Sequence, residues 1–137
     1  MIEYLTIEEV IELHDDAIRK DGGLPGIRDM NLLWSAIDAP KVSLFGQEMY
    51  PTIHEKAATY LYHIICNHPF NDANKRTGYI VTLAFLDLNN EPRFFDLEGL
   101  ECLVVQVGKG VETKERITTF LRTGCLLDLI ESPKLVH

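Results

Sequence analysis

An apolar run over residues 79–88, broken only by Thr82 and Asp87, follows closely on the polar stretch 68–76. A helix that is apolar on nearly every side is usually buried inside its domain. The run therefore predicts a buried central helix over residues 74–89. The polar stretch becomes the loop that leads into this helix, and the rest of the chain has to cover it.

The stretch 68–76 reads HPFNDANKR and combines a base, amides, a carboxylate and two cations. The first N–H groups of a helix have no internal partner, and the helix dipole adds partial positive charge there. Asn71 and Asp72 are residue types that often cap such a start. Lys75 and Arg76 fall in the first turn, where cations are unfavourable for the helix itself. Two cations at this place predict an anionic ligand, and a polyphosphate fits best.

Transfer of a phosphoryl or nucleotidyl group to a hydroxyl needs a base, a metal ion and neutralisation of charge. His68 carries the lone pair available at neutral pH, so we predict that it is the base. Asp72 is the only carboxylate of the stretch, and one carboxylate plus phosphate oxygens commonly holds Mg²⁺. We expect Phe70 to point into the core and, together with Asn71, to position the loop.

The remaining residues of the stretch are suited to phosphate. Asn74 can donate to a phosphate oxygen while staying neutral, and Ala73 permits close approach of the backbone to a ligand. Lys75 offers a point charge, and Arg76 offers a fork that matches two oxygens. A capped polar turn with solvated cations would explain any one of these residues, but it explains their convergence at one helix start poorly.

Helical periodicity and stop signals predict an all-α single domain over residues 1–137, with about six helices. A capping box at Thr6 begins the first helix and Asp29 begins the second. The pattern breaks over residues 41–51, which we interpret as a short hairpin or flap. The tail 125–137 adds a short helix or frays. We interpret His14 as a core-edge histidine held by a hydrogen bond, and Trp34 as a packing anchor.

Composition excludes several other classes of protein. No apolar run approaches the roughly 20 residues of a membrane span, and the N-terminus lacks the pattern of a signal peptide. The three cysteines Cys66, Cys102 and Cys125 are widely spaced, which favours reduced thiols in the cytoplasm. The net charge of -8 argues against broad binding of nucleic acid, which needs a basic face.

The stretch HPFNDANKR resembles the signature of the Fic/Doc superfamily, His-x-Phe-x-Asp/Glu-Gly/Ala-Asn-Gly/Lys-Arg. Ala73 and Lys75 are the variants of the Doc (death-on-curing) branch, the toxins of toxin–antitoxin pairs. The stretches LHDDAIRKDGGLPGIRD and YPTIHEKAATYLYHIICNHPF are similar to Doc toxins as well. The resemblance covers roughly the whole chain and is weakest after Gly124.

The resemblance implies a Fic fold and an ATP-dependent reaction with Mg²⁺. Fic proteins with glycine at position 75 typically transfer AMP to a target hydroxyl. Doc toxins carry lysine there and transfer the terminal phosphate to a threonine of elongation factor Tu, which stops translation. Tyr79 also departs from the AMP-transferring pattern, which has a second arginine at this position. The resemblance further implies that the flap over residues 41–51 holds the acceptor segment of the target beside the motif.

The self-inhibitory motif of the superfamily, Ser/Thr-x-x-x-Glu-Gly/Asn, is absent from this sequence. The resemblance therefore implies restraint by a separate, Phd-like antitoxin whose segment lies over the site. Three functions stay open: a Doc-like toxin kinase, an AMP transferase on the same fold, and a non-catalytic module that binds a nucleotide or partner. The intact His68 and Asp72 argue against the third, because a binding module needs neither a base nor a metal ligand.

Overall fold

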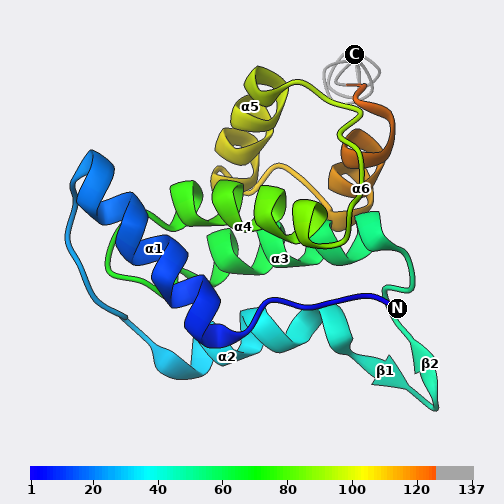
Figure 1. Ribbon diagram of the computed structural model, residues 1–137, viewed down its shortest axis with the longest axis horizontal. Helices are drawn as coiled ribbons and strands as arrows, with labels where there is room; N and C mark the ends of the chain where they lie inside the picture. Colours follow the sequence, from blue (N-terminus) through cyan, green and yellow to red (C-terminus); the bar gives the residue numbers. More distant parts are fainter. Residues whose placement is uncertain (126–137) are drawn as a thin grey trace.

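The computed structural model of the protein describes residues 1–125 and shows the predicted all-α fold of six helices (Figure 1). The helices are α1 (Ile7–Asp21), α2 (Met30–Asp38), α3 (Ile53–Asn67), α4 (Asn74–Leu88), α5 (Leu97–Gly108) and α6 (Lys114–Thr123). A 3-10 turn, η1 (Ala39–Lys41), and a hairpin of β1 (Ser43–Leu44) and β2 (Gln47–Glu48) connect α2 to α3. Of the predicted tail, all but Cys125 lies outside the described residues.

Local capping fixes where the helices begin. The Thr6 hydroxyl accepts a hydrogen bond from the Glu9 backbone N–H at 3.1 Å. The Glu9 carboxylate accepts one from the Thr6 backbone N–H at 2.8 Å, which completes the predicted capping box. Asp29 caps α2 in the predicted way through the Leu32 N–H at 3.0 Å. Such caps satisfy backbone donors that have no partner within the helix.

Helices α3 and α4 form the centre of the domain. Gly78 of α4 makes their close crossing possible, because a Cβ there would lie 3.0 Å from Ile65 of α3. The face of α4 with Val81 and Phe85 is fully buried, whereas Leu83 and its neighbours on the opposite side are partly exposed. Helix α4 is thus not the only central helix, as predicted, but forms the centre together with α3. The other side of α4 stays partly exposed because α1 and α5 cover only part of it.

Trp34 corrects one expectation. The side chain is 46% exposed, so it does not anchor the packing of α2. Leu33, Ala36 and Ile37 carry out that role, since all three are buried in the core. The helical spacing places Trp34 on the outer side of α2, where the described residues cover only about half of its surface.

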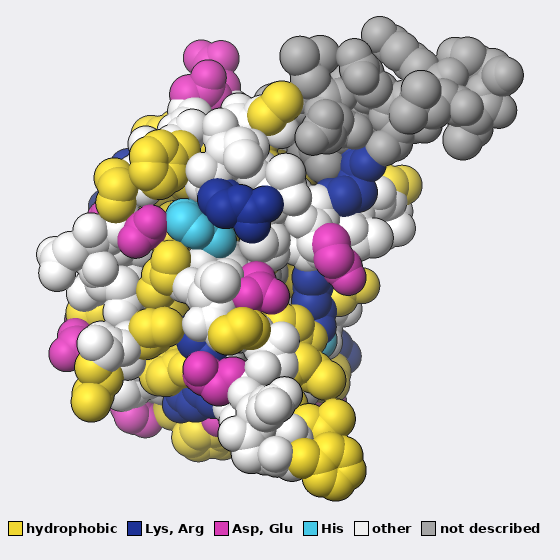
Figure 2. Space-filling model, turned by 90° about the vertical axis from the view of Figure 1, so that its right-hand side faces the viewer, with side chains coloured by type: hydrophobic (Ala, Val, Ile, Leu, Met, Phe, Trp, Pro, Cys, Tyr) yellow, Lys and Arg dark blue, Asp and Glu magenta, His cyan; other side chains and the backbone are white. Residues whose placement is uncertain are grey.

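The predicted hairpin is present, and its turn at Phe45 and Gly46 has positive φ angles of 51° and 79°. Figure 1 shows it at the N-terminal end of α3, whereas His68 follows the C-terminal end. The 15 residues of α3, roughly 20 Å in length, thus lie between the two along the chain. The role that the resemblance implies for the flap, holding the target's acceptor segment beside the motif, stays a prediction. Figure 2 views the side of the molecule that carries the hairpin, and hydrophobic side chains are scattered over this face. Leu44 and Phe45 of the hairpin are both exposed.

Within residues 1–125 no helix is long and apolar enough to cross a membrane.

Candidate functional site

The loop 68–76, called the motif loop below, runs antiparallel to residues 24–29, which we call the support segment. An isolated antiparallel bridge joins Ile27 to Phe70. The backbone bonds of this pairing are Arg28 N–H to Pro69 O (2.7 Å), Asp29 N–H to Pro69 O (3.1 Å) and Asn71 N–H to Gly26 O (3.0 Å). The motif loop is thus held by a backbone partner some 40 residues upstream in the chain.

The Asn71 side chain joins the motif loop to the support segment. The amide Nδ2 donates to Pro25 O at 3.0 Å. Gly26 has φ 102°, and a Cβ there would lie 2.9 Å from this nitrogen. Glycine at position 26 therefore leaves the space that the Asn71 amide occupies.

Phe70 and His14 form the buried base of the motif loop. Both side chains are 1% exposed, and their rings stack with centroids 3.8 Å apart. His14 Nε2 lies 2.9 Å from the backbone oxygen of Asp72, to which its N–H donates. The prediction that His14 is a hydrogen-bonded core histidine is confirmed, and Phe70 points into the core. The positioning role of Phe70 stays a prediction.

Asp72 presents an exposed carboxylate that is oriented by two backbone donors. Oδ2 accepts from Leu24 N–H at 3.0 Å, and Oδ1 accepts from Ala73 N–H at 2.8 Å. These two hydrogen bonds, followed by the positive charge of Arg76, lower the pKa of Asp72 below its usual value. The group is therefore ionised at neutral pH, as a ligand for a cation must be.

The donor set around Asp72 can be compared with what Mg²⁺ requires. Among residues 1–125 no group of three or more His, Cys, Asp or Glu side chains could hold a metal ion. A single carboxylate fits Mg²⁺ that is bound mainly by substrate phosphates and water, the usual arrangement for this ion in phosphotransfer sites. Asp72 thus fits the ion as one ligand of such a site.

His68 lies at the C-terminal cap of α3 with φ 50° and ψ 55°, and its side chain is exposed. Its Nδ1 is 3.5 Å from Asn74 Nδ2, a contact at the limit of hydrogen bonding. The His68 ring thus has a contact at Nδ1 and is otherwise exposed, so an acceptor hydroxyl can reach it.

Asn74 is occupied differently from our expectation. Its Oδ1 accepts from Phe70 N–H and its Nδ2 donates to Phe70 O, both at 3.0 Å. The side-chain amide therefore closes the loop between Phe70 and α4. The expected phosphate contact of Asn74 has no support in this geometry, because both ends of its amide already have backbone partners.

The start of α4 lacks the caps that we expected. Its N-cap is Ala73, at φ 62°, and no side chain caps the helix. Asn71 and Asp72 do not cap it because Pro25 and Leu24 of the support segment engage their side chains. The first N–H groups of α4 are consequently open to an anion.

The two cations of the motif diverge. Arg76 Nη1 donates to Ala17 O at 3.0 Å and to Gly22 O at 3.2 Å, so the guanidinium group binds the C-terminal end of α1. Lys75 is exposed and lies against Gly108, the last residue of α5. His68 and Asp72 thus lie on the loop before the open start of α4 and Lys75 lies in its first turn, while Arg76 braces α1 against α4.

Sequence reasoning missed Arg28, whose side chain donates to the backbone oxygens of His68 and Asn67. The available signal was the pair Gly23 and Gly26, of which the first directly precedes the support segment and the second lies within it. A Cβ on Gly23 would lie 2.9 Å from Asp72 Oδ2, just as one on Gly26 would meet Asn71. Two glycines that closely spaced indicate that another part of the backbone or its side chains approaches there.

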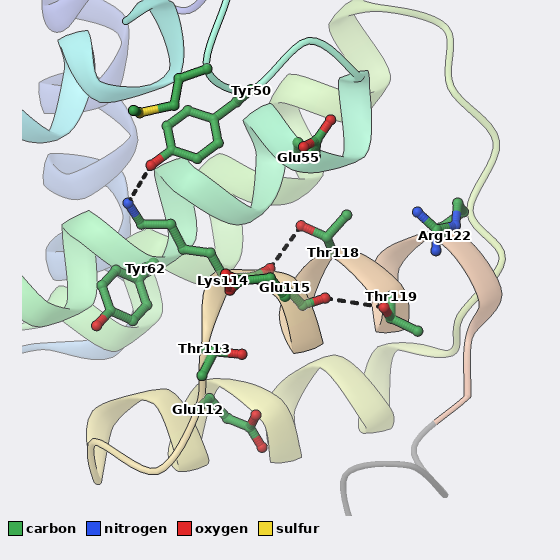
Figure 3. A pocket seen from close by; sticks show the side chains of 11 residues that line it. Tyr50, Glu55, Tyr62, Glu112, Thr113, Lys114, Glu115, Thr118, Thr119 and Arg122 are labelled. Atoms are coloured by element: carbon green, nitrogen blue, oxygen red, sulfur yellow. Dashed lines mark hydrogen bonds between the residues drawn. The ribbon is translucent and has the colours of Figure 1, made fainter.

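An open groove of about 680 Å³ lies elsewhere, between the segment that follows β2, α3 and α6 (Figure 3). Lys114 reaches across it: Nζ donates to the Tyr50 hydroxyl at 2.7 Å and lies over the rings of Tyr50 and Tyr62. No residue of the motif loop lines this groove. Its central cation already has partners from this chain, so we do not assign the chemistry to it.

The fold and the motif loop together define a small helical domain of the Fic type, with an exposed histidine and a carboxylate at an open helix start. A family model described as "Fic/DOC family" matches residues 4–86, more than half of the chain, and the chain belongs to this family. "Toxin Doc" of Mycolicibacterium smegmatis is 34% identical over 109 residues, which cover 78% of this chain and 82% of that protein. "Protein kinase doc" of Escherichia phage P1 is 34% identical over 121 residues, covering 88% and 94%.

Proposed function

We propose that the protein is a Doc-like toxin of a toxin–antitoxin pair that transfers the γ-phosphate of ATP to a protein hydroxyl. A threonine of elongation factor Tu is the first candidate acceptor, so the transfer would inhibit translation. The observation that carries the proposal is the exposed His68 and the ionised Asp72 at the uncapped start of α4. Its relatives named as a toxin and as a protein kinase support the same reading. Such an activity belongs in the cytoplasm, where ATP and translation factors are found.

The residues divide the chemistry among themselves. His68 takes the proton of the acceptor hydroxyl as its oxygen attacks the γ-phosphorus, and the bond from this phosphorus to the β–γ bridging oxygen breaks to release ADP. The open N–H groups of α4 and the Lys75 ammonium bind the phosphate oxygens, which carry the negative charge. Asp72 would hold Mg²⁺, which when bound neutralises charge on the phosphates. Arg76 contributes by holding α4 against α1 and, through its exposed part, by its positive charge.

Two alternatives are distinguished by a labelling experiment. The purified protein is incubated with elongation factor Tu and ATP labelled at either the α or the γ position. Label from the γ position on the factor supports the kinase, and label from the α position supports AMP transfer. Failure to label any cytosolic protein would leave a nucleotide-binding or partner-binding module and end the enzymatic proposal.

An antitoxin is expected to restrain this protein. A catalytic loop this exposed, in a chain without the self-inhibitory motif, needs a partner that covers it. We expect a small acidic or amphipathic, Phd-like protein, encoded nearby, whose segment folds over the motif loop on binding. Expression of the wild-type chain alone should arrest growth and co-expression of the partner should restore it. Normal growth with the chain alone, at protein levels confirmed by immunoblot, would contradict the expectation.

Replacement of Gly108 tests whether the rate of transfer depends on the position of the Lys75 side chain. A Cβ at position 108 would lie 2.9 Å from Lys75 Cδ, so Gly108→Ala should displace the lysine side chain. Alanine is favoured over glycine in a helix by up to about 1 kcal/mol, so stability should not fall. We expect a several-fold loss of transfer rate with an unchanged or higher melting temperature. In a Lys75→Gly background the same change should have no further effect on rate, and an additional loss there would show that Gly108 acts by another route.

A further inference from the structure

Arg28 binds the chain on both sides of the proposed base. Its Nε donates to His68 O at 2.6 Å, and its Nη2 donates to Asn67 O at 2.8 Å. Its own backbone N–H donates to Pro69 O at 2.7 Å. One residue of the support segment thus engages three successive carbonyl groups, those of residues 67, 68 and 69.

These carbonyls belong to a helix end that has an unusual conformation. The last carbonyls of an α-helix lack intrahelical donors, and glycine in a left-handed conformation commonly closes the helix through its backbone N–H. Here His68 occupies the left-handed position, at φ 50° and ψ 55°, where a residue with a side chain is uncommon. Pro69 follows and has no N–H to donate. The guanidinium of Arg28 supplies the donors, and its positive charge suits the negative end of the α3 dipole.

We infer that Arg28 is a positioning residue that fixes the left-handed backbone of His68 and so aims the imidazole at the acceptor hydroxyl. This inference rests on the proposed function of His68 as the base. A planar guanidinium can donate to two neighbouring carbonyls at once, whereas a lysine ammonium acts as a single point charge. The side chain is exposed, so its removal leaves no cavity in the core.

The test compares Arg28→Met with the wild-type full-length chain. Misplacement of a reacting group by about 1 Å can cost on the order of 100-fold in rate. We therefore expect kcat to fall by roughly 10- to 100-fold with the KM for ATP within about twofold, because nucleotide binding depends on α4. Arg28→Lys should recover only part of the loss. Arg93→Met is the matched control, since Arg93 pairs with Asp87 at 3.0 Å on another part of the surface, and it should leave kcat unchanged.

A readout that does not depend on activity separates this inference from the proposed function. The NMR chemical shift of the His68 Cα reports whether its backbone is left-handed. Arg28→Met should move this shift towards the disordered value, while most other amide signals stay in place. An unchanged His68 shift, or a kcat equal to that of the wild type, would overturn the inference. If Arg28→Met does not fold, Arg28→Lys is measured in the same way. A wild-type chain without transferase activity would refute the proposed function, and the His68 shift would then decide the positioning role alone.

Discussion

His68→Ala is expected to remove phosphate transfer and growth arrest while the protein still binds ATP. Loss of a general base costs on the order of 100- to 10,000-fold in rate. Binding should persist because it depends on the backbone N–H groups at the start of α4 and on the Lys75 ammonium, none of which the His68 side chain supplies. Single-turnover transfer from γ-labelled ATP and an ATP titration measure the two quantities. A mutant that still transfers phosphate at a near-normal rate would show that His68 has only a structural role.

His63→Ala is the matched control for this experiment. His63 lies on the same helix, five residues before His68, and burial lowers its pKa to about 4, with a further contribution from Lys114. It is therefore neutral at pH 7 and is partly covered by its surroundings. Because His63 is not the proposed base, His63→Ala should leave the rate of transfer nearly unchanged. An equal loss in both mutants would point to a general effect on α3.

The helices could be predicted from the sequence because the signals that fix them are local. Thr6 and Glu9 are three residues apart and complete their capping box without help from the rest of the chain. The same holds for Asp29 at the start of α2. Periodicity likewise showed which face of each helix is apolar, although it could not show that α3 and α4 share the centre. That outcome depends on how many other helices are available to cover each face.

The partners of the motif side chains could not be predicted, because they lie far away in the sequence. Asp72 is oriented by Leu24, 48 residues upstream, and Arg76 binds a carbonyl of α1, 59 residues upstream. The prediction that Asn71 and Asp72 cap the next helix was wrong for the same reason. Both side chains form hydrogen bonds with the distant support segment instead. The residue types of the site were thus evident from the sequence, whereas their division into exposed and supporting groups required the fold.

Lys75→Gly is expected to abolish γ-phosphate transfer, and this is the mutation that separates the two enzymatic readings. The attacked phosphorus must lie in line with the acceptor oxygen near His68. Which phosphate occupies that place depends on how ATP lies across the start of α4. Glycine at position 75 would leave room for the α- and β-phosphates to enter deeply, while lysine fills the space and supplies a charge. In the structure Lys75 is exposed at the first turn of α4, with its chain against Gly108, so it can serve both purposes.

Removal of a positioned electrostatic group typically lowers the rate on the order of 100-fold or more, and we expect a loss of that size from Lys75→Gly. Weak transfer of AMP could be gained, limited by Tyr79, which stands where AMP-transferring relatives have an arginine. Lys75→Met distinguishes charge from volume, because it keeps the length of the side chain and removes the ammonium. If the filled space directs the nucleotide, Lys75→Met retains γ-transfer at a reduced rate without AMP transfer; if the charge directs it, both variants lose γ-transfer alike. Wild-type γ-transfer by Lys75→Gly would mean that Lys75 does not orient ATP, and the kinase proposal would lose its physical basis.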